Sequence, residues 1–417
     1  MGGLNWAGNY TYRAERLHRP STLEQVRAIV ASAPRVRVLG TRHSFNDIAD
    51  SAELLTLAAL PADVVLDRAA GTVSFGAGMT YGELAMALND AGLALHNMAS
   101  LPHISVAGAV ATATHGSGDA SGNLATAVAG LEIVTSGGDV VTASRGEADF
   151  DGLVVGLGAL GAVTRLTLEV EPAYDVRQRV FEDLAWETLH ERFDEISGSG
   201  YSVSVFTRWR RAADQVWVKS RVTDAPEEIL PDLFGAPAAT VDRHPILGID
   251  PVNCTPQLGR PGLWSDRLSH FRLGFTPSSG EELQSEFLVP REHAAGAIEA
   301  VRARADRIRP VLQVSEIRTI AADRLWMSPQ YGRDTVGFHF TWEPRPDTVA
   351  RVIAEVEAAL APFEARPHWS KLFHAEAATI AALYERLPDF VRLTERLDAR
   401  GAFRNAWLEA RVLGGGA

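Results

Sequence analysis

The 417-residue sequence predicts an α+β protein of two or three domains. Three observations lead to this prediction. The chain is longer than one ordinary domain. In its first third, short strand patterns alternate with helical patterns, as in layered α/β structures. After Pro172, longer alternating strands and a few helices indicate a second domain of α+β type.

The first third contains two predicted helices and several short strands. Residues 21–32 are expected to be helical, with Ser21 or Thr22 as the N-cap and Glu24 completing a capping box. Residues 81–91 form an amphipathic helical pattern that ends at Gly92. Alternation of apolar and polar residues predicts strands at 36–39, 54–60, 64–68 and 71–76.

Two runs of small residues lie further along. Residues 104–118, ISVAGAVATATHGSG, allow their backbone to lie against a ligand or another backbone, with a tightly packed small-residue helix as the alternative. Residues 156–161, GLGALG, match the GxGxxG dinucleotide fingerprint. That fingerprint requires a following helix, whereas residues 162–170 alternate as a strand. We therefore expect a turn or close backbone approach at 156–161, and an NAD-linked dehydrogenase is disfavoured.

The second half of the chain is predicted from its periodicity. Strands are expected at 201–209, 215–222, 311–320 and 335–342. Helices are expected at 290–309, 346–361, 374–386 and 388–399. A connector rich in Pro and Gly spans about 225–265.

Composition excludes several classes of partner. The net charge of −12 argues against nucleic acid or an anionic membrane surface as a main partner. There is no apolar run of about 18 residues and no apolar signal core at the N-terminus, so we expect no membrane span and a cytoplasmic location. The single cysteine, Cys254, rules out internal disulfides and cysteine-based metal sites, and we expect it to be a small buried residue. We predict no metal ion.

Lysine is rare in this chain. Lys and Arg together number 40, and only Lys219 and Lys371 are lysines. Lys219 lies in an alternating strand and is expected on a solvated face. Lys371 follows His368 and Trp369, and a lysine near such groups is a candidate functional residue because its pKa falls on burial.

The segment 36–46, VRVLGTRHSFN, is the most informative stretch. A short strand enters Gly40, and a polar loop then presents His43. Loops of this kind after a strand can direct backbone N–H groups at a phosphate, so that His43 would contact what the phosphate carries. The alternative is a strand followed by a turn with an exposed histidine.

A second set of candidates lies on two predicted strands. Glu316 and Arg318 share one strand face, and His339 and Thr341 share another, because alternate residues of a strand point the same way. If both faces and Lys371 line one cavity, that cavity suits a small ligand rich in hydroxyl groups. The alternative is two half-exposed strands with charged outer faces.

These segments together resemble a known family. The loop 40–45, GTRHSF, resembles the flavin-attachment loop of the vanillyl-alcohol-oxidase superfamily of covalent flavoproteins, although many members have glycine where this chain has Arg42. Residues 97–108, NMASLPHISVAG, and 112–118, TATHGSG, are similar to the second FAD-binding run of that superfamily. The bacterial alditol (xylitol) oxidases, in its sugar- and polyol-oxidising branch, share the motifs EIR at 316–318, HFT at 339–341, HWSK at 368–371 and FRN at 403–405.

The resemblance implies a fold and a cofactor. The fold is an α+β structure with a two-part FAD-binding domain, residues 1–171 and the C-terminal segment 372–417, and an inserted α+β substrate (cap) domain at 172–371. FAD would be attached covalently to His43 through its 8α-methyl carbon. The residues implied around FAD are Gly40, Thr41, Arg42, His43, Ser44, Ser100, Ser105, Val106, Gly108, Thr112, Thr114, His115, Gly116, Ser117 and Gly118.

The resemblance also implies a reaction. The terminal hydroxyl of an alditol such as xylitol or sorbitol would be oxidised to the aldose, with hydride passing to flavin N5 and O2 reoxidising the flavin to give hydrogen peroxide. Lys371 would stabilise the developing alkoxide and His339 would steer the proton. Glu316 and Arg318 would hold neighbouring hydroxyls, with Thr341 lining the site. Ser100 would lie close to the flavin ring and the substrate hydroxyl.

Two other functions remain open at this stage. An aldonolactone oxidase or dehydrogenase of the same superfamily would have a similar flavin site. A non-catalytic polyol- or flavin-binding protein needs no reactive cluster, so the grouping of Glu316, Arg318, His339 and Lys371 argues against it. The expected partners are a small polyol and O2, with the protein as a monomer.

Overall fold

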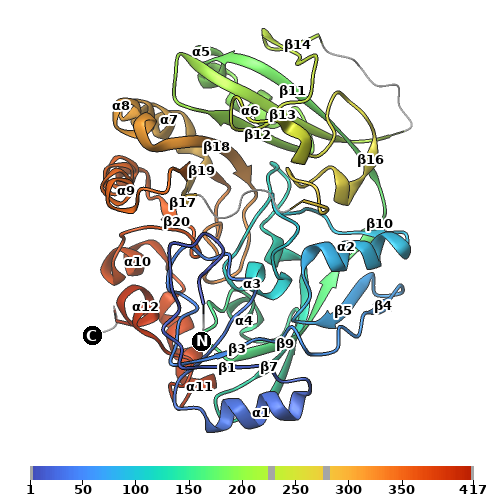
Figure 1. Cartoon of the computed structure of the whole chain (residues 1–417), viewed down its shortest axis with the longest axis vertical. Helices are drawn as coiled ribbons and strands as arrows, with labels where there is room; N and C mark the ends of the chain where they lie inside the picture. The colour runs from blue at the N-terminus through green and yellow to red at the C-terminus, as the bar shows by residue number, and fades with distance from the viewer. Residues whose placement is uncertain (1–2, 224–230, 276–281, 415–417) are drawn as a thin grey trace.

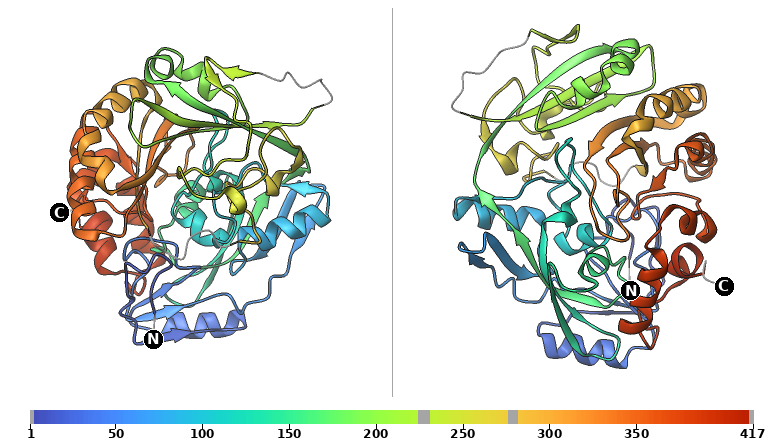
Figure 2. Two further views of the ribbon diagram at one scale, coloured as in Figure 1. Left: turned by 45° about the horizontal axis from the view of Figure 1, so that its top comes forward. Right: turned by 180° about the vertical axis from the view of Figure 1, so that it is seen from behind.

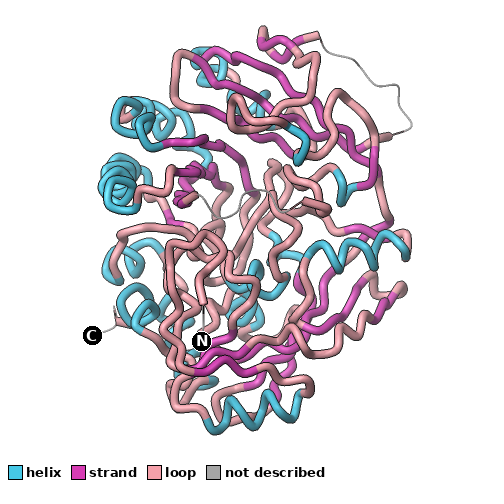
Figure 3. Tube along the Cα trace, viewed as in Figure 1, coloured by secondary structure: helices cyan, strands magenta, loops and turns pink. Residues whose placement is uncertain are grey.

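Two large antiparallel sheets and a small parallel sheet organise the molecule (Figure 1). The computed structural model describes residues 3–223, 231–275 and 282–414. The centre of the molecule, below the largest sheet in this view, is crossed mainly by loops (Figure 3). Loops held between rigid sheets commonly carry binding and catalytic residues.

The parallel sheet lies near the N-terminus, in the order β1-β3-β2. Its strands are β1 (Arg16–His18), β3 (Glu53–Leu55) and β2 (Val36–Val38). β3 is shorter than the predicted strand 54–60. Helix α1 (Leu23–Ser32) buries Val26 and Val30.

The cap of α1 differs from the prediction. Thr22 is the N-cap and its side chain accepts from the Gln25 N–H. Glu24 does not complete a capping box, because a helix that begins at Leu23 has Gln25 at its third position. The Gln25 side chain instead accepts from the Ser21 N–H at 2.8 Å.

The five-stranded sheet has the order β4-β5-β9-β7-β8. Its strands are β4 (Val65–Asp67), β5 (Thr72–Gly76), β9 (Ala162–Glu169), β7 (Val128–Val134) and β8 (Val140–Ser144). Helices α2 (Tyr81–Asp90), α3 (Val106–Ala111) and α4 (Phe150–Val154) accompany it, and the pair β6 (Leu93–Ala94) and β10 (Glu171–Pro172) lies beside it. In the run 104–118, the small residues thus form a six-residue helix followed by a loop.

The glycine run 156–161 is a turn that enters β9, as predicted. Gly161 has a φ of +142°, and a Cβ there would lie 2.5 Å from the carbonyl oxygen of Val134. Only glycine allows this close backbone approach. A strand follows the run in place of the helix that a dinucleotide fingerprint requires.

The eight-stranded sheet has the order β16-β11-β13-β12-β18-β19-β17-β20. Its strands are β16 (Gly262–Leu263), β11 (Asp175–Ala185), β13 (Ala212–Arg221), β12 (Ser202–Thr207), β18 (Leu312–Ile320), β19 (Thr335–Trp342), β17 (Leu283–Pro290) and β20 (Arg366–Pro367). β11 and β17 were missed in the sequence. The predicted connector contains the short pair β14 (Asp232–Leu233) and β15 (Ala236–Pro237), and its residues 224–230 lie outside the described residues.

Helices pack on one face of this sheet. They are α5 (Trp186–Glu191), α6 (Phe193–Ser197), α7 (Ala294–Arg302), α8 (Ala305–Ile308) and α9 (Pro346–Leu360). The predicted helix 290–309 is wrong as one element, because the chain turns at Ala303 and Arg304 between α7 and α8. Phe338, Phe340 and Trp342 of β19 are fully buried.

The C-terminal segment returns to the N-terminal sheet (Figure 2). It contains α10 (Ala377–Leu383), α11 (Leu387–Leu397) and α12 (Ala406–Leu408). The buried Arg37 guanidinium donates to the carbonyl oxygens of Phe403 at 2.9 Å and Gly158 at 2.7 Å. The FRN motif at 403–405 is therefore part of the contact that joins the two ends of the chain. None of the helices in the described ranges has the length and apolar character needed to cross a membrane.

Candidate active site

One face of the eight-stranded sheet is polar and buried. The strand register places Glu286 of β17, His339 of β19 and Glu316 of β18 in one row across the sheet. Gln284 and Thr341 are paired in the same way. Directly paired residues share a face, so these side chains point away from the helices that cover the other face. The predicted alternation of polar and aromatic residues in β19 is confirmed.

This face forms a wall of a cavity of about 790 Å³. The cavity is lined by all of the predicted substrate and catalytic residues, Ser100, Glu316, Arg318, His339, Thr341 and Lys371. From the other side it is lined by His43, Thr114 and His115. The alternative of half-exposed strands is wrong, because Glu316 is only 3% exposed and Arg318 only 6%.

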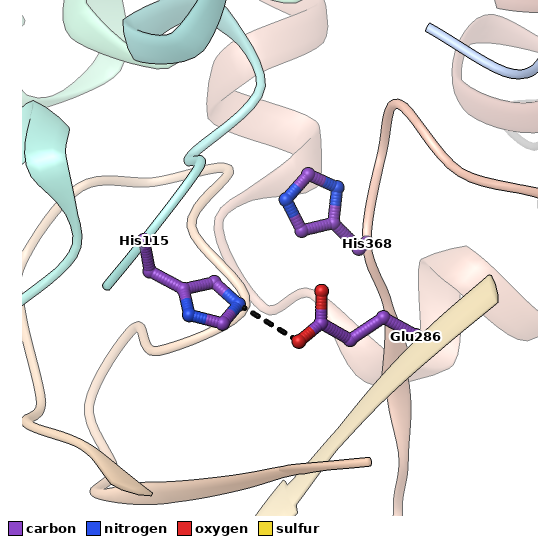
Figure 4. A group of neighbouring side chains, drawn as sticks. All are labelled: His115, Glu286 and His368. Atoms are coloured by element: carbon purple, nitrogen blue, oxygen red, sulfur yellow. Dashed lines mark ion pairs between the residues drawn. The ribbon is translucent and has the colours of Figure 1, made fainter. Parts of the chain in front are cut away.

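A buried carboxylate at the centre of the site, Glu286, binds several cationic groups. It accepts from Lys371 Nζ at 2.6 Å and from Arg318 Nη2 at 2.8 Å. His115 Nε2 lies 3.2 Å from the same carboxylate, and His368 lies beside it (Figure 4). Although burial raises it, the pKa of Glu286 is held well below its ordinary value by Lys371, His115 and Arg318. Glu286 is therefore an anion that holds two cations in the cavity.

His115, Glu286 and His368 have the spacing of a metal site, since their ligand atoms lie within 4.8 Å of one another. However, Lys371 and Arg318 each donate to one oxygen of this carboxylate. Two neighbouring positive charges oppose a third cation at the same position. The charge distribution thus favours Glu286 as a partner for Lys371 and Arg318.

His339 is poised as a neutral imidazole. Burial, and then the charge of Lys371, lowers the pKa of His339 well below its ordinary value. Its Nε2 lies 3.1 Å from Gln284 Oε1, and the Gln284 amide nitrogen donates to Glu282. This orientation of Gln284 makes Nε2 of His339 the donor and leaves Nδ1 free to accept a proton.

The loop 40–46 is attached directly to the segment that carries Lys371. Asn46 Nδ2 donates to the carbonyl oxygens of Trp369 at 2.9 Å and Lys371 at 2.8 Å. The Phe45 N–H donates to the Ser370 carbonyl at 2.7 Å. Arg42 has a φ of 65°, in the left-handed region that favours glycine. The glycine common at this position in the resembled family therefore has a conformational reason.

His43 is largely enclosed and neutral. It stacks on Trp6 with ring centroids 5.2 Å apart, and its Nδ1 lies 3.1 Å from Thr41 Oγ1. Burial, with a smaller effect of His103, lowers the pKa of His43 to about 4. The alternative of an exposed turn histidine is therefore wrong.

A second cavity, of about 150 Å³, lies on the other side of the same loop. Gly40, Thr41, Ser105 and Gly108 line it, and the Ser105 N–H donates to Thr41 Oγ1 at 3.0 Å. Because the loop contributes Gly40 and Thr41 to one cavity and His43 to the other, the two cavities together fit a long two-part ligand. Small residues and backbone groups around the second cavity suit the phosphate-bearing part of a dinucleotide.

Several predicted cofactor residues line neither of these two cavities. They are Arg42, Ser44, Val106, Thr112, Gly116, Ser117 and Gly118. Ser117 Oγ pairs with Ser202 Oγ at 2.6 Å, and the Gly118 N–H donates to the Thr319 carbonyl at 2.9 Å. These two residues join the small-residue loop to strands of the large sheet.

Several polar residues of the cavity were not among the predicted site residues, and those that contact the predicted ones include Gln284, Glu286, His270 and His368. Two of them, Gln284 and Glu286, stand two residues apart in β17 and therefore share a face. The segment LQSEFLVP has three consecutive polar residues followed by apolar ones, so it lacks the strict alternation that predicts a strand. Lys219 was wrongly predicted to be solvated, since it is 1% exposed. The prediction that Cys254 is buried is confirmed.

Comparisons with known proteins identify related sequences and a related structure. A family model for an FAD binding domain matches residues 14–144, and a model for D-arabinono-1,4-lactone oxidase matches residues 280–411. An alditol oxidase from a Streptomyces species is 49% identical over 409 residues, covering 97% of each chain. An L-gulono-1,4-lactone dehydrogenase from Mycobacterium tuberculosis is 27% identical, covering 98% of each chain. The solved structure of a cholesterol oxidase from Brevibacterium sterolicum, 14% identical, has the same fold with a TM-score of 0.79, covering 98% of this chain and 96% of that one.

Glu286→Gln should destabilise the protein strongly. It leaves Lys371 and Arg318 buried without their anion, which costs about 3–5 kcal/mol in the free energy of unfolding. Urea unfolding of the purified protein measures this. The stabilisation that Glu286 gives the folded protein is present above the pKa of about 4.3 that a glutamate has in the unfolded chain. It is lost as the pH falls, because the pKa of Glu286 is lower in the folded protein.

Glu169→Gln is the matched control for this variant. It breaks an exposed pair with Arg145, and such a pair contributes only about 0–1 kcal/mol. Equal unfolding free energies for the two variants at neutral pH would contradict the role assigned to Glu286.

Proposed function

Because this chain belongs to the family of FAD-dependent alditol oxidases, we propose that it oxidises the terminal hydroxyl of alditols such as xylitol and sorbitol to the aldose. The observation that carries the proposal is the buried row of Glu286, His339 and Glu316, with Arg318 and Lys371, in one cavity. Such a set of donors and acceptors suits a ligand with a hydroxyl on each carbon.

The two cavities on either side of the loop 40–45 support binding of FAD. We propose that residues 1–171 and 372–417 hold it and that 172–371 cover the substrate. Gly40, Thr41, Ser105 and Gly108 would face its phosphates, and His43 its ring system. When bound, FAD accepts a hydride at N5 and passes the electrons to O2, which gives hydrogen peroxide.

Side chains of the cavity bind the alcohol and remove its hydroxyl proton. The Lys371 ammonium, held at 2.6 Å from Glu286, stabilises negative charge on the reacting oxygen. His339 accepts the hydroxyl proton at Nδ1, because its Nε2 donates to Gln284. Glu316 accepts from a neighbouring hydroxyl and Arg318 donates to one, while Thr341 and Ser100 complete the wall. Burial of these groups strengthens each interaction.

His43 has the properties needed for covalent attachment of the flavin. A neutral imidazole retains a nucleophilic lone pair, and the low pKa of His43, about 4, keeps it neutral. Stacking on Trp6 limits rotation of the ring. We propose that a nitrogen of His43 bonds to the 8α-methyl carbon of the flavin. One C–H bond of that carbon and the N–H bond of the imidazole would be lost, and O2 would take up the two electrons and two protons as hydrogen peroxide.

A lactone oxidase or dehydrogenase is the second candidate. It is favoured by the family model for D-arabinono-1,4-lactone oxidase at residues 280–411. That part of the chain carries all of the predicted substrate and catalytic residues except Ser100. The two candidates differ in substrate and in electron acceptor.

The purified protein should release hydrogen peroxide with xylitol or sorbitol under air. A peroxidase-coupled assay measures this, beside an aldonolactone with a dye acceptor as the comparison. Dye reduction with the lactone and no peroxide from either alditol would favour the second candidate and overturn the first.

His43→Ala should abolish covalent flavin attachment. After acid precipitation, yellow colour should stay in the pellet of the wild-type protein and enter the supernatant of the variant. His190→Ala, which changes an exposed histidine, should behave like the wild type. A colourless wild-type pellet from a protein that contains FAD would remove His43 from this role.

Lys371→Met should slow anaerobic flavin reduction by xylitol by about 100-fold or more, because a donor to the developing alkoxide is lost. Stopped-flow absorbance measures the rate. Lys371→Arg keeps the charge and should retain more of the rate than the methionine variant. A methionine variant within twofold of the wild-type rate would exclude Lys371 from charge stabilisation.

A further inference from the structure

Of the two lysines of this chain, Lys219 is buried and Lys371 is partly buried, and both are linked to carboxylates of the cavity. Lys371 binds Glu286 directly. Lys219, on β13, lies behind the cavity wall and is 1% exposed. Because this chain otherwise uses arginine apart from Lys371, a lysine at position 219 needs a separate physical reason.

The surroundings of Lys219 require an ammonium group. Its Nζ donates to the carbonyl oxygens of Arg267 at 2.8 Å, Leu268 at 2.6 Å and Ser269 at 3.0 Å. His270 Nδ1 lies 3.3 Å from the same atom. Three acceptors converging on one nitrogen suit a compact –NH3+ group, whereas a planar guanidinium cannot point its donors in this way.

His270 connects this ammonium to the cavity. The ammonium has three protons for these four acceptors, so Nδ1 of His270 shares one of them with a carbonyl oxygen. Because an ammonium has no lone pair, Nδ1 cannot donate to it, and the ring proton then resides on Nε2. Nε2 lies 2.9 Å from Glu316 Oε1 and therefore donates to it. Burial, and then Lys219, lowers the pKa of His270 to about 4, so the ring is neutral.

The imidazole ring is also held from its sides. Phe206 and Trp217 each make an edge contact with it, with ring centroids 5.4 Å apart. Thr255 supports the loop, since its N–H donates to the His270 carbonyl at 2.9 Å and its hydroxyl to the Ser269 carbonyl at 2.8 Å. The donor to Glu316 is thus fixed in place and direction.

We propose that Lys219 and His270 are positioning residues for substrate binding: Lys219 fixes the tautomer of His270, and His270 holds Glu316 as the acceptor for a substrate hydroxyl. This inference rests on the proposed oxidation of alditols. A fixed carboxylate accepts from a hydroxyl but cannot pair with a carbonyl oxygen. The Lys219–His270 pair therefore contributes to selection of a polyol.

The proposal implies a pH dependence. Burial lowers the pKa of Lys219 to about 7, so the ammonium is present below that value and is lost above it. The groups facing Lys219 are His270, Cys254, Arg267 and Glu316. Burial raises the pKa of Cys254 to about 12, and the pKa of His270 is about 4, so neither titrates near neutrality.

The first test compares His270→Phe with His270→Gln. Phenylalanine keeps the aromatic contacts and removes the donor, whereas the glutamine amide supplies a donor near the position of Nε2. In His270→Phe we expect KM for xylitol to rise about tenfold, while the limiting rate of flavin reduction stays within threefold of the wild-type rate. In His270→Gln we expect KM to lie closer to the wild-type value than to that of His270→Phe. Equal KM values for the two variants would overturn the proposal.

The second test uses Lys219→Met. At pH 6 we expect KM for xylitol to be higher than in the wild type, as in His270→Phe. Above about pH 7 the difference in KM should shrink, because the wild-type Lys219 then loses its proton. The double variant Lys219→Met, His270→Phe should show no further rise beyond His270→Phe. An additive effect, or an unchanged KM in a folded Lys219→Met protein, would overturn the role of Lys219. If Lys219→Met does not fold, the two His270 variants still test the role of His270. The role of Lys219 is then tested by the tautomer of His270 in the wild-type protein, as measured by 15N labelling.

A substrate-free measurement separates this inference from the proposed function. In protein labelled with 15N-histidine, with His270→Phe to assign the signal, we expect at pH 6 a neutral His270 with its proton on Nε2, and a change in that signal in Lys219→Met. A proton on Nδ1 in the wild type overturns the inference whatever the enzyme oxidises. Absence of xylitol oxidation by the wild type, with the expected tautomer, counts against the proposed function alone.

Discussion

The buried carboxylate of Glu286 is the interaction on which the site depends. A lysine and an arginine cannot be buried side by side without an anion between them, because each would lose its hydration and repel the other. Glu286 accepts from both and lies next to His115, so it brings together β17, β18 and the loop after β20. The positive charge needed near a reacting alcohol is thereby kept at the wall of the cavity.

The loop 40–46 and the polar wall of the cavity are held together by hydrogen bonds. The hydrogen bonds of Asn46 and Phe45 to the backbone of 369–371 link the loop that carries His43 to the segment that carries Lys371. A displacement of one segment would therefore move the other. Behind this wall, the series Lys219, His270 and Glu316 extends the polar network to β13, and every member of the series is hydrogen-bonded. Fully paired networks of this kind are rigid.

Local patterns predicted the elements that local physics controls. The strands that carry Glu316 and His339, the helix 81–90 and the turn at 156–161 follow from alternation, capping and glycine geometry. The errors occurred where long-range packing decides. The strands β11 and β17 and the burial of Lys219 depend on which strands become neighbours in the eight-stranded sheet.

The sequence alone determined the family, the His43 loop and the polar residues of two strands, because these are carried by short motifs and by a period of two. Only the tertiary structure decided that Glu286 of β17 lies in one row with His339 and Glu316. It also placed the second lysine against His270, which contacts Glu316 of the same cavity. The physical reason is register: side-chain direction is encoded locally, but the strand against which it lies is chosen by the packing of the whole sheet.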